Sequence, residues 1–190
     1  MKRMMLSLTL LTVTPWVAAE SIVEIADVHP RGEVEVSNVA GTVNVEGWDR
    51  DQVKVDGELG RGAERLEFRA DGRHTLVKVI YPKSSRRSGG TDLVIRIPLA
   101  SPLSVNAVSA DIDVSGVEGA QRLQSVSGNV TTQARGEDVR IETVSGDLSL
   151  RGHGDPALVS ITTVSGDVDL RDLHGEVNVQ SVTGDVDLDS

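Results

Sequence analysis

The sequence predicts an all-β fold, a repetitive β-solenoid in which coils of about 18 residues stack as in a β-helix. The first observation is a corner motif that recurs with spacings of 18, 18, 20 and 18 residues. Its five copies are Val108-Ser109-Ala110-Asp111, Val126-Ser127-Gly128-Asn129, Val144-Ser145-Gly146-Asp147, Val164-Ser165-Gly166-Asp167 and Val182-Thr183-Gly184-Asp185. The second observation is that apolar and polar residues alternate on both sides of each corner, which indicates strands with one buried face. Each unit is too short to bury that face alone, so neighbouring units must cover one another.

The unit from Val159 to Glu176 shows the pattern clearly. Val159 and Ile161 precede the corner and Val168 and Leu170 follow it, each separated from the next by a polar residue. The matching inward positions in the other units are Leu103, Val105, Ile112, Val114, Leu123, Val130, Val139, Ile141, Leu148, Leu150, Val177, Val179, Val186 and Leu188. The unit around Val126 is the least apolar, because Gln121 and Thr132 stand at inward positions.

The chain divides into a leader and one predicted domain. Residues 1–19 have the three parts of a secretory signal peptide: the basic start Lys2-Arg3, an apolar run from Met4 to Val13, and small residues before Glu20. The alternative is an uncleaved anchor, although the apolar run is short for a membrane span. Residues 20–190 are expected to form a single β-solenoid domain. No second apolar run follows the leader, so the processed chain is not expected to be an integral membrane protein.

Three parts are expected within that domain. Residues 34–56 match the later units and predict a first coil, and residues 101–190 form the repeat array. Residues 57–100 predict an insertion: a β-hairpin around Asp71-Gly72 followed by an alternating strand from Leu93 to Leu99. The two extra residues between the third and fourth corners fall in Gly152–Pro156, where Gly and Pro indicate a bulging loop.

Two further segments accompany the corners, Val43-Asn44-Val45-Glu46-Gly47-Trp48-Asp49 and a strand that ends in Ile97-Pro98. Together with the corners they resemble the bacterial putative-adhesin family of unknown function, a toastrack-like β-solenoid domain of cell-envelope proteins. The resemblance covers most of residues 20–190 and implies a non-enzymatic envelope protein, often associated with envelope stress. It implies no catalytic, ligand or cofactor residues. The chain departs from the pattern at one corner, where Ala110 replaces Gly.

Composition excludes several kinds of chemistry. The chain has no cysteine, so it has no disulfide, thiol nucleophile or thiolate metal site. Its formal net charge is -10, and loss of Lys2 and Arg3 with the leader would make it -12. A surface of this sign repels nucleic acid at long range, so nucleic acid is not an expected partner.

The acidic residues that follow the corners are the candidate metal ligands. In a stack, Asp111, Asn129, Asp147, Asp167 and Asp185 form one outward column, with neighbours about 4.8 Å apart. Carboxylate oxygens suit calcium, which makes Asp111, Asp147, Asp167 and Asp185 the candidates, although they lack a closed ligand set. The alternative is a solvated face whose charges discourage unwanted strand pairing.

The function expected from the sequence is an exported, periplasmic or secreted interaction scaffold that binds an envelope protein or polymer. The alternative is a β-helix enzyme or cation-binding protein that acts on envelope polysaccharide. Glycoside chemistry needs two carboxyl groups at a defined separation, whereas acids are spread evenly here. The last predicted strand ends almost at Ser190. Its coil is therefore left open or covered by a partner, or the chain is a short version of a longer array, and an open coil predicts self-association through this end.

Overall fold

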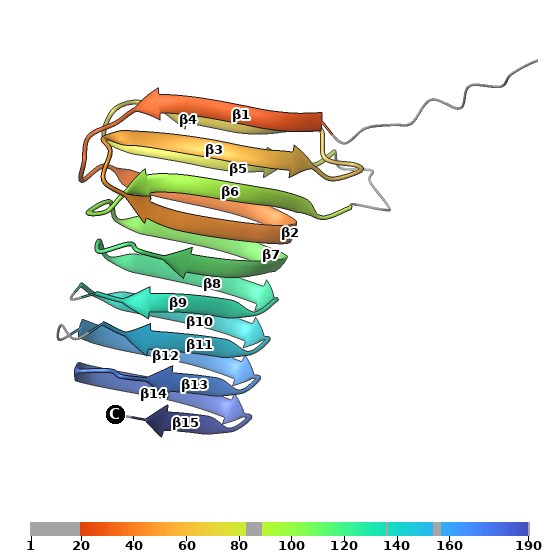
Figure 1. Ribbon diagram of the computed structural model, residues 1–190. Coiled ribbons are helices and arrows are strands. Elements are labelled where there is room, and N and C mark those ends of the chain that lie inside the picture. The colour runs from red at the N-terminus through yellow and green to blue at the C-terminus, as the bar shows by residue number, and fades with distance from the viewer. Residues whose placement is uncertain (1–19, 83–88, 136, 154–156, 190) are drawn as a thin grey trace, which may run out of the picture.

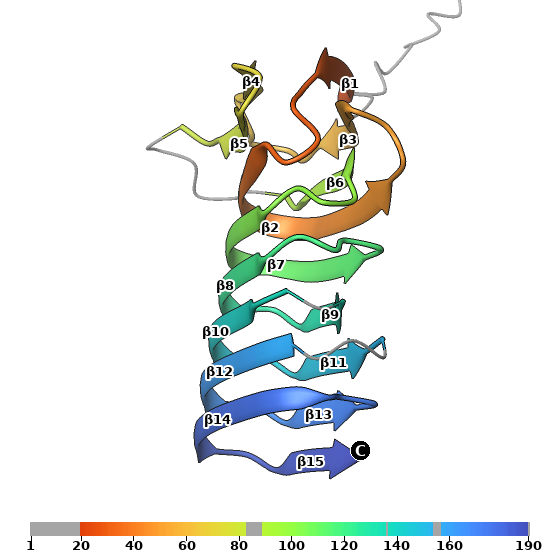
Figure 2. The same ribbon diagram turned by 90° about the vertical axis from the view of Figure 1, so that its left-hand side faces the viewer.

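The chain folds into two walls of stacked β-strands that meet along one edge (Figures 1 and 2). The computed structural model describes residues 20–82, 89–135, 137–153 and 157–189, and the predicted leader therefore lies outside the described residues. Within these ranges the only regular secondary structure is β-strand, and the fifteen strands form one open sheet. The predicted all-β solenoid is confirmed.

The repeat array supplies both walls with parallel strands. The first wall contains β8 (Gln121–Ser127), β10 (Val139–Ser145), β12 (Ala157–Ser165) and β14 (Gly175–Thr183). The second wall contains β9 (Val130–Ala134), β11 (Leu148–Gly152), β13 (Val168–Arg171) and β15 (Val186–Asp189). Equivalent residues of successive coils pair directly, as in the pairing of Ile141 with Leu123 and Ile161. The strands on both sides of the 20-residue spacing keep this register, so the two extra residues fall in the loop between β11 and β12. Residues 154–156 of this loop lie outside the described residues.

Two long strands run through the corner and belong to both walls. They are β2 (Glu33–Trp48) and β7 (Leu103–Ser115), which pair in parallel from Val34 with Leu103 to Glu46 with Ser115. Ala110 lies inside β7 and is fully buried. Its φ is not positive, unlike that of Gly128 in the next coil, which explains why this corner accepts a side chain.

An antiparallel cap covers the N-terminal end of the stack. Above β2, the first wall continues with β5 (His74–Ile80) and the second with β6 (Thr91–Pro98). Three antiparallel strands follow: β4 (Arg65–Ala70) on β5, β3 (Gln52–Leu59) on β6, and β1 (Glu20–Asp27) on β3. The β4–β5 pair is the predicted hairpin. The segment expected to form a first coil, residues 34–56, is divided: residues 34–48 stack on β7, whereas residues 52–56 belong to β3, because the turn after Trp48 reverses the chain.

Aliphatic columns fill the space between the walls, with Ile141, Ile161 and Leu170 essentially inaccessible to solvent. The least apolar unit compensates for its polar residues by pairing them. The Thr132 hydroxyl in β9 lies 2.5 Å from Oε1 of Gln121 in β8, and the Gln121 amide donates to the Gln133 carbonyl at 2.8 Å. Both side chains are buried, and hydrogen bonding removes most of the cost of their burial.

The last coil differs from the others in exposure. Val186 and Leu188 occupy inward positions of β15 but are 47% and 53% exposed, whereas Leu170, one coil earlier, is 0% exposed. Within the described residues β14 pairs only with β12 and β15 only with β13. Among the described residues, no strand covers the apolar interior on the far side of β14 and β15.

Candidate functional site

The corner ladder, which comprises Asp111, Asn129, Asp147, Asp167 and Asp185, is held by hydrogen bonds between coils. In each step the backbone N–H of one coil donates to Oδ1 of the equivalent residue in the preceding coil. The pairs are Asn129 to Asp111 at 2.8 Å, Asp147 to Asn129 at 3.0 Å, Asp167 to Asp147 at 3.1 Å, and Asp185 to Asp167 at 3.0 Å. The side chains thus satisfy backbone donors at the bend, where the chain leaves the regular strand pairing.

This geometry gives the repeated acids a structural role that requires no metal. Asn129 takes the same part as the aspartates, so the ladder needs a side-chain oxygen and not a negative charge. Among the residues that the structure describes, no three His, Cys, Asp or Glu side chains form a group that could hold a metal ion. Calcium binding by Asp111, Asp147, Asp167 and Asp185 stays a prediction.

Substitution of Asp147 separates the two roles. We expect Asp147→Ala to lower the free energy of unfolding by about 1 kcal/mol, because the Asp167 N–H loses its acceptor. Asp147→Asn should stay within about 0.5 kcal/mol of the original chain, because the amide oxygen still accepts and one charge is removed. Urea unfolding followed by circular dichroism measures both. A melting temperature that rises with calcium in the original chain but not in Asp147→Asn would instead show that the column binds cations.

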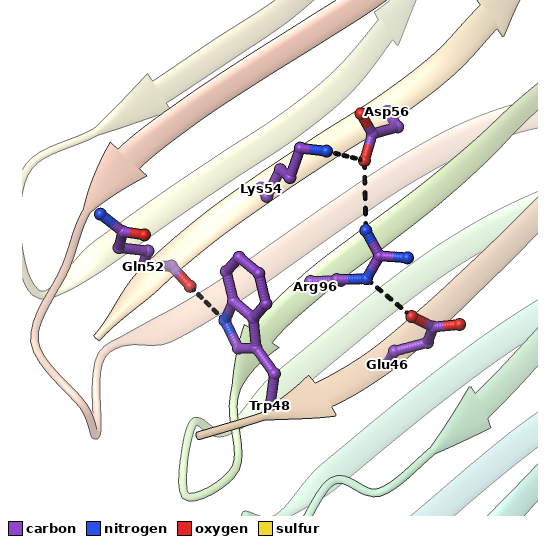
Figure 3. Close-up of polar contacts among 6 residues, drawn as sticks. All are labelled: Glu46, Trp48, Gln52, Lys54, Asp56 and Arg96. Atoms are coloured by element: carbon purple, nitrogen blue, oxygen red, sulfur yellow. Dashed lines mark hydrogen bonds and ion pairs between the residues drawn. The ribbon is translucent and has the colours of Figure 1, made fainter. Parts of the chain in front are cut away.

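A chain of polar contacts links the cap to the first coil (Figure 3). Arg96 of β6 donates to Oε2 of Glu46 in β2 at 2.8 Å and lies 3.5 Å from Oδ2 of Asp56 in β3, which also contacts Lys54 at 2.8 Å. These side chains are 26–50% exposed. Exposed ion pairs contribute about 0–1 kcal/mol each, so the cluster aligns three strands at a modest gain in stability.

Trp48 closes the turn between β2 and β3. Its indole N–H donates to the Gln52 carbonyl at 2.8 Å, as Figure 3 shows, and the Arg50 guanidinium lies 5.0 Å from the ring centre. The side chain is partly buried. The tryptophan therefore fixes the point at which the chain turns back into the cap.

A column of exposed valines lies at the corner, and we call it the valine ridge. Its members occupy equivalent positions in six successive levels: Val39, Val108, Val126, Val144, Val164 and Val182. They are 38–79% exposed. Six levels at about 4.8 Å per level make a ridge about 24 Å long. The repeat motif contains these valines and alternation places them outward, but the sequence analysis did not single them out as a surface.

A groove runs beside the valine ridge on the first wall. The groove has a volume of about 400 Å³. Val126, Val144 and Val164 line one side of it. Gln124, Glu142 and Thr162 line the opposite side. Ser125 and Thr143 are also in the lining, and their side chains point inward and are buried. The ridge and the groove are therefore neighbouring convex and concave features of one surface.

The two walls differ in charge. The charged residues of β8, β10, β12 and β14 are Arg122, Arg140, Glu142 and Glu176, so their formal charges cancel. The strands of the second wall, with the corner residues before them, carry six aspartates (Asp147, Asp167, Asp169, Asp185, Asp187 and Asp189) against Arg151 and Arg171, a formal charge of -4. The negative charge of this array is therefore concentrated on the second wall, and the groove lies on the neutral one.

Parallel in-register walls, glycine corners and an antiparallel cap define an all-β, two-walled solenoid. The chain belongs to the Toastrack DUF4097 family, whose model matches residues 33–190. The family resemblance noted in the sequence is thereby confirmed. In the part of the chain that the structure describes, no helix is long and apolar enough to cross a membrane.

Two solved structures align with this chain at low sequence identity. A crystal structure described as a putative cell adhesion protein from Clostridium sporogenes aligns with a TM-score of 0.60 and 11% identity, over 90% of this chain and 99% of that one. A putative adhesin from Bacteroides fragilis aligns with a TM-score of 0.42 and 11% identity, over 89% and 97% of the two chains. The chain matches no curated protein. The first similarity shows a common fold.

Proposed function

We propose that this chain is an exported, non-enzymatic interaction scaffold of the bacterial cell envelope, adhesin-like in type. The observation that carries the proposal is the stack itself, in which each coil repeats the same outward positions at a fixed rise. Such a surface suits extended or repetitive partners, because equivalent side chains recur along it. Membership of the Toastrack family and the shared fold with a putative cell adhesion protein support the same class.

Export is tested by the mass of the chain recovered from a bacterial host. We expect the protein outside the cytoplasm, with residues 1–19 removed and Glu20 at its N-terminus. Leu8→Arg, which places a charge in the apolar run, should retain the full-length chain in the cytoplasm. Recovery of the original chain intact in the cytoplasm would contradict export.

The proposed association with envelope stress predicts that the transcript of this protein rises after treatment with a cell-wall inhibitor.

Scaffold activity is tested by binding of the labelled, purified chain to isolated envelopes, with and without calcium. We expect saturable binding. Envelopes digested with protease before the assay distinguish a polymer partner, which survives digestion, from a protein partner, which does not. Absence of binding to both preparations would contradict the envelope role.

The enzymatic alternative has its own test. Release of small fragments from an anionic envelope polysaccharide, abolished by Asp167→Ala, would support it.

A further inference from the structure

We propose that the valine ridge and the adjoining groove of the first wall form an interface between two copies of this chain. The ridge valines stand 38–79% exposed along about 24 Å of an acidic protein. Aligned apolar side chains of this kind, beside a groove, are a recognised mark of an interaction surface. This inference goes beyond the proposed function, because dimer formation requires neither export nor an envelope partner.

The shape of the surface favours a second copy as the occupant. A two-fold interface must be self-complementary, with the same patch on both partners. A ridge beside a parallel groove meets this condition. A two-fold axis that runs between them, along the stack, lays the valines of each copy over the groove of the other. Val144 of one copy then faces the groove beside Ser125 and Thr143 of its partner.

The repeat distance favours the same occupant. Successive ridge valines are about 4.8 Å apart, since they belong to hydrogen-bonded strands. A partner must repeat at this distance to fill every gap between the valines. A second copy of the chain has the same repeat distance in every coil that carries the ridge.

Charge also favours this wall over the other. Two chains of formal charge -10 repel one another, and this repulsion is strongest if their aspartate columns approach. Contact through the first wall keeps both second walls, each with a formal charge of -4, facing away. The contact area is small: the ridge and groove span three residues of each strand, such as 124–126, so a patch about 24 Å long and about 10 Å wide covers roughly 240 Å² per copy. The dimer therefore belongs to the weak, reversible class of interfaces.

The first experiment is sedimentation velocity of the purified chain over a concentration series. We expect a monomer–dimer equilibrium. The triple variant Val126→Thr, Val144→Thr, Val164→Thr keeps the shape and the β-branching of the side chains, and we expect it to weaken dimerisation about 100-fold or more. The matched control is Val186→Thr with Leu188→Thr in the open last coil, which should dimerise like the original chain. A circular dichroism spectrum like that of the original chain shows that each variant is folded.

The second experiment uses the absence of cysteine from the chain as a clean background. With a short bis-maleimide, Val144→Cys should give a covalent dimer, whereas Ser149→Cys on the second wall should give little. A strictly monomeric chain at all concentrations overturns the proposal, as does a ridge triple variant that dimerises normally. Loss of dimer only in the Val186→Thr, Leu188→Thr variant also overturns it, in favour of end-to-end association through the last coil.

Discussion

Replacement of Gly146 with alanine is expected to lower the free energy of unfolding by about 3–5 kcal/mol. Two independent effects add. Gly146 has a φ of 124°, a conformation that costs any residue with a Cβ. A Cβ placed there would also lie 2.8 Å from the carbonyl carbon of Gly128 in the preceding coil, and closer still to its oxygen. Backbone on both sides is held in the strand pairing, so it cannot move aside without breaking the stack.

Gly72→Ala is the matched control for this prediction. Gly72 has a φ of 83°, but a Cβ there would have no neighbouring atom within 4 Å. It therefore carries the conformational cost alone, about 1–2 kcal/mol. Urea unfolding of both variants, followed by circular dichroism, compares them directly. Equal losses in the two variants would mean that close approach of the coils at the glycine corners contributes nothing.

The repeat array could be predicted from the sequence because its information is local and periodic. Val159, Ile161, Val168 and Leu170 alternate with polar residues, and the same pattern returns one coil later. The position of the cap could not be predicted in this way. The pairing of β6 with β2 joins residues about 50 positions apart, such as Val45 and Ile95, and no repeated motif marks it. The reversal of β3 depends on the turn after Trp48, where the indole hydrogen bond to Gln52 is visible only in the structure.

The role of the corner ladder was only partly predictable. The sequence showed that Asp111, Asp147, Asp167 and Asp185 share one outward column. Which atoms they contact depends on the register of the coils and on the bend at each glycine. Asn129 was the available clue, because an amide in the column accepts a hydrogen bond as well as a carboxylate but is a poorer ligand for a cation.

The valine ridge was not predicted as a surface, because the sequence analysis treated its valines only as part of the corner motif. Strict alternation would place Val144 and Ser145 on opposite faces of a strand. In the structure both are exposed, because the chain bends at Gly146 directly after them. The period-two pattern therefore holds as far as Val144 and fails at Ser145, so alternation accounts for the exposure of the valines and the bend for that of the residue after each of them.

The second large effect is expected from Leu170→Ala, which should lower the free energy of unfolding by about 2–5 kcal/mol. Leu170 is 0% exposed and lies between Leu150 in β11 and Leu188 in β15. Its removal leaves a cavity between coils that are held at a fixed spacing by hydrogen bonds, so the neighbours cannot close it. The loss should fall on the interfaces with both adjacent coils, because each coil of a solenoid contacts only its neighbours.

Leu188→Ala is the matched control, since it is the same substitution in the same column one coil later. Leu188 is 53% exposed and has a neighbouring coil on one side only, so we expect a loss below about 1 kcal/mol. Hydrogen exchange should show the same asymmetry, with amides of β15 exchanging before those of β11. A loss for Leu188→Ala as large as that for Leu170→Ala would show that the last coil is covered in solution. Dependence of that loss on protein concentration would identify the cover as another copy of the chain, associated end to end.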